Sequence, residues 1–135
     1  MSAIAERVPS VNLRDRTSRE KLAKMIVALL DRWALAPADQ AALLGLSAQS
    51  RSTVARYRRG EPLADSADLL ARAGHLLGIH KALRILFPQD RDLAYRWVSA
   101  PNRRFGGAAP VEIMKRHGYE GILAVRRYLD FERGR

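Results

Sequence analysis

The fold is decided by residues 37–62, PADQAALLGLSAQSRSTVARYRRGEP, which predict two short helices with a break between them. The first helix should begin at Pro37, because the fixed φ of proline suits the first helical position, and stop at Gly45, a natural left-handed cap. The second should begin near Ser50, a good N-cap, and stop at Gly60. This arrangement matches a helix-turn-helix, whose second helix enters the major groove of DNA.

The second of these helices carries the residues that we expect to contact DNA. Four arginines occur on it with no acidic residue before Glu61, and small polar residues lie in its first turn. The predicted DNA-binding residues are Arg51, Ser52, Thr53, Arg56, Arg58 and Arg59. Nine positions separate Gly45 from the apolar Val54, where a usual helix-turn-helix has about six, so the turn must be lengthened. A helical hairpin with a solvated arginine face remains the alternative interpretation.

The composition favours a globular protein that binds a polyanion or an acidic surface. The chain has 135 residues, of which 47% are hydrophobic, and its net charge is +10. Such a chain is long enough for one domain or two small helical modules. The basic excess is spread along the sequence, so one nucleic-acid site need not account for all of it. The absence of cysteine and of an apolar run long enough for a membrane predicts a cytoplasmic protein.

The region before the helix-turn-helix predicts an arm followed by a helix. Residues 1–17 show no apolar period and should form a flexible N-terminal arm. Apolar residues then recur at intervals of one and three, which predicts an amphipathic helix over about residues 18–33. Thr17 and Glu20 would form a capping box at its start.

The region after the helix-turn-helix also reads as helical. Asp65 or Ser66 should cap a helix that Gly78 ends or bends, and a further helical stretch then continues towards Pro88. Residues 18–88 are therefore predicted to form a small domain of five helices, and no β-pattern occurs anywhere in the sequence. We expect an all-α protein.

Residues 89–135 predict a second helical module. Its first helix should start at Asp90 or Asp92. A loop then leads to Pro110, which should begin a helix that ends at Gly118, and a last helix follows.

Several glycine, proline and aromatic positions of this second half fall at set spacings together: Leu86-Phe-Pro88, Ala94-Tyr-Arg-Trp97, Pro101-Asn102, Phe105-Gly-Gly107, Pro110, Val125, Leu129 and Gly134. The pattern resembles the toxin-binding module of the Xre/MbcA/ParS antitoxins, in which an Xre-like helix-turn-helix precedes it, as it does here. The resemblance covers about residues 18–135. It divides the chain into an Xre-like DNA-binding domain over residues 18–88 and a toxin-binding domain over residues 89–135.

The resemblance implies an antitoxin of a type II toxin–antitoxin system. Its partner would be a RES-domain toxin that consumes NAD, or a toxin that ADP-ribosylates its targets. The C-terminal segment, residues 122–135, would cover the toxin's active site, while the N-terminal domain binds operator DNA as a homodimer and represses its own operon. Scaffold roles are expected for Trp97 in the core, for Asn102 in a turn and for Gly107 at a special φ.

Physical chemistry supports a toxin-binding role for the C-terminal segment. A pocket for NAD must hold a pyrophosphate, so arginines suit parts of it, and an exposed aromatic side chain can anchor an interface. The predicted toxin-binding residues are Arg126, Arg127, Tyr128, Phe131, Arg133 and Arg135. In the alternative interpretation, Tyr128 and Phe131 pack on the tryptophan helix and the arginines are solvated.

Catalysis finds little support in the sequence. His75, His80 and His117 do not form a ligand pair at helical spacing, and no cysteine joins them. We therefore expect no enzyme activity, no metal and no cofactor. Two other functions remain open: a helix-turn-helix transcriptional regulator without a toxin partner, and a toxin-neutralising module that has lost DNA binding.

Overall fold

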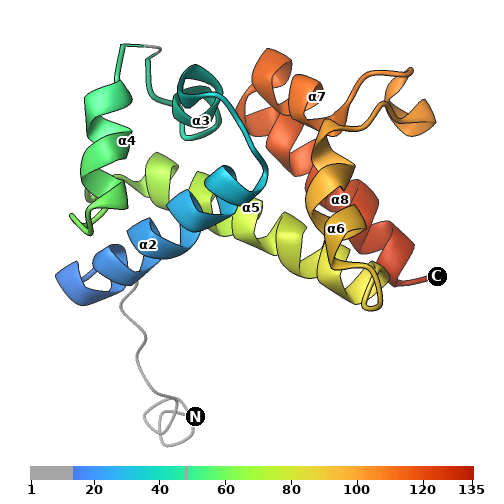
Figure 1. Ribbon diagram of the computed structural model, residues 1–135, viewed down its shortest axis with the longest axis horizontal. Coiled ribbons are helices and arrows are strands. Elements are labelled where there is room, and N and C mark those ends of the chain that lie inside the picture. Colours follow the sequence, from blue (N-terminus) through green and yellow to red (C-terminus); the bar gives the residue numbers. More distant parts are fainter. Residues whose placement is uncertain (1–13, 48) are drawn as a thin grey trace, which may run out of the picture.

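The computed structural model describes residues 14–47 and 49–135. These residues form seven α-helices and two short 3-10 helices without any strand, which confirms the predicted all-α class (Figure 1). The elements are α2 (Arg16–Arg32), α3 (Pro37–Leu43), α4 (Arg51–Arg58), α5 (Ala67–Leu86), α6 (Arg91–Arg96), η1 (Trp97–Ser99), η2 (Arg103–Phe105), α7 (Pro110–His117) and α8 (Tyr119–Arg133). Residues 1–13 of the predicted arm lie outside the described part of the chain. No helix within that part is long and apolar enough to cross a membrane.

The start of α2 differs from the prediction. Asp15 is the N-cap, and its carboxylate accepts a hydrogen bond of 2.7 Å from the backbone N–H of Ser18. The predicted capping box of Thr17 and Glu20 is therefore wrong, and Glu20 instead accepts a hydrogen bond from Arg16. Aspartate and threonine are both good caps, and the carboxylate two positions earlier is the one that caps the helix.

The helix pair at residues 37–62 is confirmed. Pro37 opens α3, and Gly45 follows it with a left-handed φ of +74°. Ser50 stands at the N-cap position of α4 without a side-chain cap bond, since its hydroxyl lies 3.0 Å from that of Ser47. Gly60, with φ of +102°, ends the second helix as predicted. Residues 44–50 thus separate the two helices, as the predicted lengthening of the turn requires.

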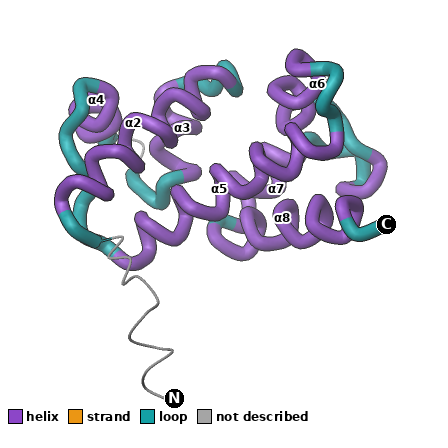
Figure 2. Tube along the Cα trace, turned by 90° about the horizontal axis from the view of Figure 1, so that it is seen from below, coloured by secondary structure: helices purple, strands orange, loops and turns teal. Residues whose placement is uncertain are grey.

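Helix α5 is one uninterrupted helix of 20 residues, where two shorter helices were predicted. Ser66 caps it by accepting from the N–H of Leu69, and Gly78 neither ends nor breaks it. The described N-terminal region therefore has four α-helices rather than five. Figure 2 shows α5 running through the molecule, and it contacts both α2 and α8.

In the second half, the helices begin and end close to the residues predicted for them. Asp90 caps α6, Pro110 opens α7, and Gly118 joins α7 to α8. The turn prediction for Asn102 is confirmed, because its side chain accepts from the N–H of Arg104 at 2.9 Å. Gly107 has the expected positive φ, +89°. Trp97 is half-buried at the edge of the core rather than inside it.

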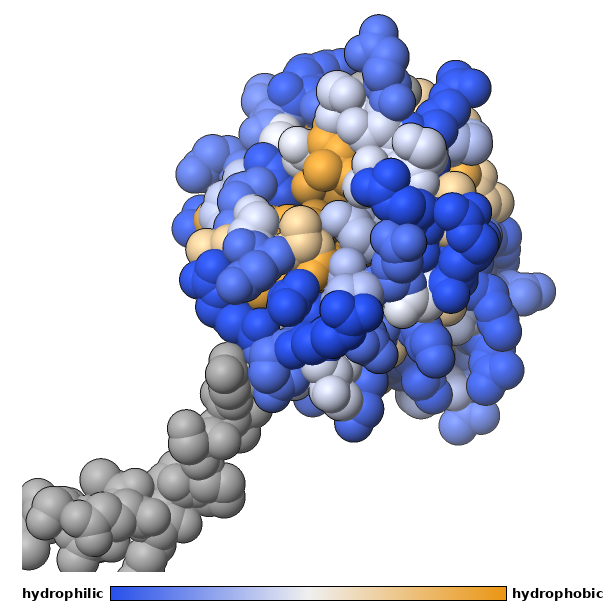
Figure 3. Space-filling model, turned by 90° about the vertical axis from the view of Figure 1, so that its left-hand side faces the viewer, coloured by the Kyte–Doolittle hydropathy of each residue, from blue (hydrophilic) through white to orange (hydrophobic). Residues whose placement is uncertain are grey.

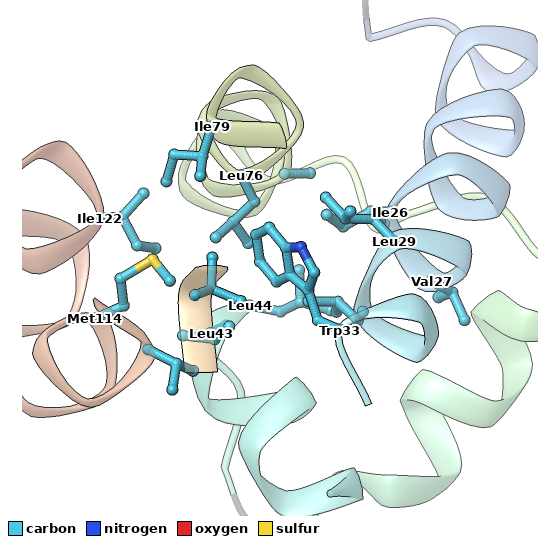
Figure 4. Close-up of a cluster of buried hydrophobic side chains, with 14 of the residues drawn as sticks. Ile26, Val27, Leu29, Trp33, Leu43, Leu44, Leu76, Ile79, Met114 and Ile122 are labelled. Carbon is cyan, nitrogen blue, oxygen red and sulfur yellow. The ribbon is translucent and has the colours of Figure 1, made fainter. Parts of the chain in front are cut away.

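Both halves contribute to a single hydrophobic core. Figure 4 shows Leu76 of α5 and Leu44, which follows α3, between Trp33, which follows α2, and the C-terminal side chains Met114 and Ile122. All five side chains are buried. Packing across the two halves therefore fixes the orientation of α4 relative to α8, and the domain boundary at residue 88 stays a prediction.

Candidate DNA-binding and partner-binding surfaces

Helix α4 lies at one end of the molecule with its polar face outward. Val54 and Tyr57 are buried against the core, and the Tyr57 hydroxyl accepts a hydrogen bond from the N–H of Ala64. Of the predicted DNA-binding residues, Thr53 is half-buried and the following are exposed: Arg51, Ser52, Arg56, Arg58 and Arg59. Figure 3 shows the side of the molecule on which α4 lies, and most of it is hydrophilic. The helix is thus anchored by its apolar face and presents the other to solvent.

Arg58 is committed to contacts within the protein. Its Nε and Nη2 atoms donate to the two oxygens of Asp31 at 3.1 and 2.9 Å, and Nη2 also donates to Gln40 Oε1 at 3.1 Å. Gln40 is the buried polar residue of this region, and it donates in turn to Asp31 and to the carbonyl of Leu35. The hydrogen bond from Arg58 is the largest cause that lowers the pKa of Asp31.

This network ties α4 to α2 and α3, and no pattern in the sequence predicts it. Asp31 and Gln40 lie far from Arg58 along the chain, in positions where neither has a recognisable motif. The assignment of Arg58 to DNA stays a prediction, but its guanidinium already has partners.

The other arginines of α4 divide into two kinds. Arg56 forms an ion pair of 3.2 Å with Glu61, in which both side chains are about half exposed. Within residues 14–47 and 49–135, neither Arg51 nor Arg59 takes part in an ion pair. Exposed ion pairs contribute little energy, so Arg56 can exchange Glu61 for another anion. The cations most available to a phosphate are Arg51, Arg56 and Arg59.

We expect Arg58→Ala to lower the free energy of unfolding by about 1 kcal/mol, because Gln40 Oε1 loses its donor and Asp31 its partner. Arg59→Ala removes the same side chain one position along and should change stability by less than about 0.5 kcal/mol. Urea unfolding of both variants measures the difference. Equal effects would contradict a structural role for Arg58.

At the opposite end of the molecule, Tyr128 of α8 belongs to an aromatic cluster. Its ring stacks on Trp97 with 6.2 Å between centroids and meets Phe105 edge-on at 5.6 Å. The guanidinium of Arg104 lies over the same ring, 5.6 Å from its centroid. Tyr128 is half-buried by these contacts and fixes α8 to the loop before α7.

Arg126 lies against α5, with its side chain still 36% exposed. Its guanidinium lies over Gly78, where any Cβ would clash with it, and Nη1 donates to His75 Nδ1 at 2.8 Å. Since arginine only donates, His75 Nδ1 must be the acceptor, which places the ring proton on Nε2, 3.1 Å from the hydroxyl of Tyr119. The prediction that Gly78 bends the helix is therefore replaced by another role: it gives Arg126 room to cross α5.

The remaining predicted toxin-binding residues lie on the outer side of α8 and at its end. Phe131 is 64% exposed, one of three large hydrophobic side chains exposed in the described part of the chain. Arg127 is exposed, and no ion pair among the described residues includes it. Arg133 and Arg135 are exposed and lie near Asp130 and Glu132 at 3.9 and 3.3 Å. The surface that α8 offers a partner therefore centres on Arg127 and Phe131.

Two histidines of α5 should make the protein sensitive to mild acid. Burial is the main cause that lowers the pKa of both from the ordinary 6.5, with a smaller effect of Arg126 on His75 and of Arg84 on His80. The unfolded chain then binds protons that the folded protein excludes, so stability is complete above about pH 6.5 and falls as the pH drops below it. The slope should stay under about 1.4 kcal/mol per pH unit for each histidine.

Urea unfolding of the wild type and of the double variant His75→Gln/His80→Gln between pH 7.5 and pH 5 measures this effect. The variant should lose most of the dependence. If the variant lost as much unfolding free energy between pH 7.5 and pH 5 as the wild type does, groups other than these histidines would cause the effect.

The comparisons with known proteins agree with this arrangement of two surfaces on one core. Residues 14–78 match the antitoxin Xre-like helix-turn-helix domain, and residues 82–135 match the antitoxin Xre/MbcA/ParS C-terminal toxin-binding domain. The chain belongs to the Xre/MbcA/ParS antitoxin family. In this antitoxin the first match contains α2, α3 and α4, and the second contains α6, α7 and α8. Helix α5 extends from one match into the other.

Two relatives support the assignment. The antitoxin is 39% identical over 106 residues to the uncharacterized protein y4oB of Sinorhizobium fredii, a match that spans 78% of this chain and 79% of that protein. It is 27% identical over 112 residues to Antitoxin Xre of Pseudomonas putida. The second match spans 82% of this chain and 65% of the relative, slightly less than two thirds of its length.

Proposed function

We propose that this protein is the antitoxin of a type II toxin–antitoxin pair and that it neutralises a RES-type, NAD-degrading toxin, or an ADP-ribosylating one, by covering its active site. The observation that supports this proposal is a toxin-binding-domain match that ends in a helix with an exposed aromatic residue, Phe131. Exposed aromatic side chains are typical anchors of protein interfaces. Both expected partners, the toxin with its NAD and the operator, place this function in the cytoplasm.

Helix α8 is suited to act as the covering element. Ile122, Val125 and Leu129 bury one face of it in the core, so the helix is held in place before any partner arrives. A preformed surface binds without the entropic cost of ordering. The opposite face offers Phe131 as an apolar anchor and Arg127 as a cation for the part of the toxin pocket that holds the pyrophosphate of NAD.

The proposal includes repression of the protein's own operon through α4. A homodimer would present two copies of this helix to successive major grooves, as helix-turn-helix proteins do. The anchored position of α4 and its exposed Arg51, Arg56 and Arg59 support this role. Thr53, in the first turn of α4, would be the residue that contacts base edges.

The salt dependence of operator binding tests the DNA part of the proposal. If two to four arginines of each protomer neutralise phosphates, about four to eight counterions are released by a dimer, and the logarithmic salt slope should be roughly −4 to −7. Fluorescence anisotropy with the promoter of the operon, from 50 to 300 mM salt, measures this slope. Arg59→Ala should reduce it by about two. An affinity for operator DNA that does not change with salt concentration would contradict phosphate contacts by α4.

Co-purification with the product of the neighbouring gene, followed by an NAD-consumption assay, tests the whole proposal. We expect a stable complex, NAD loss with the toxin alone, and no NAD loss once the antitoxin is added. A neighbour that neither binds this protein nor consumes NAD or modifies targets would instead favour a transcriptional regulator without a toxin partner. If this protein forms the complex with the toxin but does not bind the operator, only the neutralising function remains.

A further inference from the structure

A groove lies on the molecule apart from α4 and from the exposed face of α8. It has a volume of about 780 Å³ and is bounded by α2, α5, α6 and the connection between α5 and α6. Pockets of this size can receive several side chains of a partner or one small ligand. Neither of the two proposed binding functions uses it.

The walls of the groove are apolar and exposed. Met25 of α2 is 56% exposed and Ile85 of α5 is 48% exposed, and both line it. With Phe131, they are the large hydrophobic side chains that stand exposed in the described residues. Two of these three thus lie in one groove, which is a concentration typical of an interaction surface. Methionine adapts its shape to a partner at little cost.

The rim of the groove is positively charged. Lys81, Arg84 and Arg91 line it, no lining residue is acidic, and none of these three cations joins an ion pair among the residues that the structure describes. Arg84 lies in the last turn of α5, where the helix dipole favours a cation. Arg91 is the first residue of α6 and lies next to Asp90 and Asp92 in the sequence, with neither of which it forms an ion pair among the described residues. An acidic group that entered the groove would therefore meet three cations on its rim.

His80 adds a polar group to the lining of the groove. Its ring stacks on Tyr95 with 4.5 Å between centroids. Neither ring nitrogen finds a hydrogen-bond partner within the described residues, although both atoms are buried. A buried polar atom without a partner is costly, and a carboxylate in the groove could accept from the N–H of His80 only if the ring turned toward the groove.

We propose that this groove binds an acidic, apolar segment of the cognate toxin, as a second contact beside α8. The inference rests on the proposed function, because its occupant is the toxin. The domain matched as toxin-binding begins at residue 82 and therefore contains Arg84, Ile85 and Arg91 of the groove. A second copy of this chain is a poor occupant, since a symmetric contact would bring the cations of both rims together.

The full-length antitoxin and the toxin encoded beside it test this inference by titration and by NAD consumption. Arg84→Glu, Arg91→Glu and Ile85→Ser should each raise the Kd for the toxin about tenfold. The two charge reversals should also flatten its salt dependence. Saturating amounts of each variant should still inhibit the toxin fully, because α8 is intact. Lys21→Glu makes the same charge change on an exposed part of α2 and should bind like the wild type.

Thermal unfolding of each variant shows whether its fold is intact, and Met25→Ser provides a second test at the opposite wall of the groove. If the wild type inhibits the toxin and all groove variants bind as tightly as Lys21→Glu, the groove is not a toxin contact, while the proposed function stands. A wild type that binds no toxin overturns both.

Discussion

The Gly121→Ala variant should unfold about 10 °C below the wild type, which corresponds to a loss of ~2–4 kcal/mol. Gly121 is buried where α8 crosses α7, and a Cβ at this position would overlap the carbonyl oxygen of Ile113 and lie 3.0 Å from the Cα of Met114. Both obstacles are backbone atoms, so no side-chain rotation relieves them. The two helices must move apart, and the buried contacts of Met114 and Ile122 loosen with them.

Gly74→Ala is the matched control, because the same methyl group is added within another helix. No atom lies within 4 Å of the position that a Cβ would take at Gly74. Removing a glycine from a helix interior should therefore raise stability by ~0.5–1 kcal/mol. Differential scanning calorimetry of the two variants compares them directly. Shifts of the same sign would contradict a close crossing of α7 and α8.

Phe131→Ala should weaken inhibition of the toxin about a hundredfold, as expected for an aromatic anchor at an interface. Because this side chain is 64% exposed in the free protein, the melting temperature should hardly change. Arg127→Glu should add to the loss by placing an anion at a site for phosphate groups. Titration of NAD consumption with each antitoxin variant measures the effect, and Arg116→Ala, an exposed position on α7, is the control.

A point substitution is a sharper test than truncation here. Deletion from Ile122 onward would remove Ile122, Val125 and Leu129, which are buried in the core, so loss of function would follow from loss of fold. Full inhibition by the Phe131→Ala/Arg127→Glu protein would place the covering surface elsewhere than α8.

Local chemistry explains what could be predicted from the sequence. Pro37 and Pro110 open helices, and Asp90 caps one, because each acts through its own backbone or the next few residues. Gly45 and Gly118 end helices for the same local reason. The start of α2 was mistaken only because two good caps stand two positions apart, and the choice between them depends on packing.

The contacts that organise the two surfaces lie beyond such local rules. Arg58 was assigned to DNA as part of an arginine-rich helix, yet its partner Asp31 is 27 positions away. Arg126 was assigned to the toxin, yet it donates to His75, 51 positions away. A side chain on a polar helix face can point to solvent or to a neighbouring helix. The packing of α4 against α2 and α3 decides this for Arg58, and the packing of α8 against α5 decides it for Arg126. The family resemblance predicted the domains but not these pairs.

The uninterrupted α5 has a consequence for the lifetime of the protein. A nick in the connection between α6 and α7 that released the last two helices would leave Leu76 and Ile79 of α5 bare to water. The remnant would retain α3 and α4 but would lose the contact of α3 with α7 and the cover of α5 by α8, so it should unfold or be digested further. A single cleavage would then remove the proposed operator-binding and toxin-binding surfaces together, and no stable fragment that contains α4 would persist.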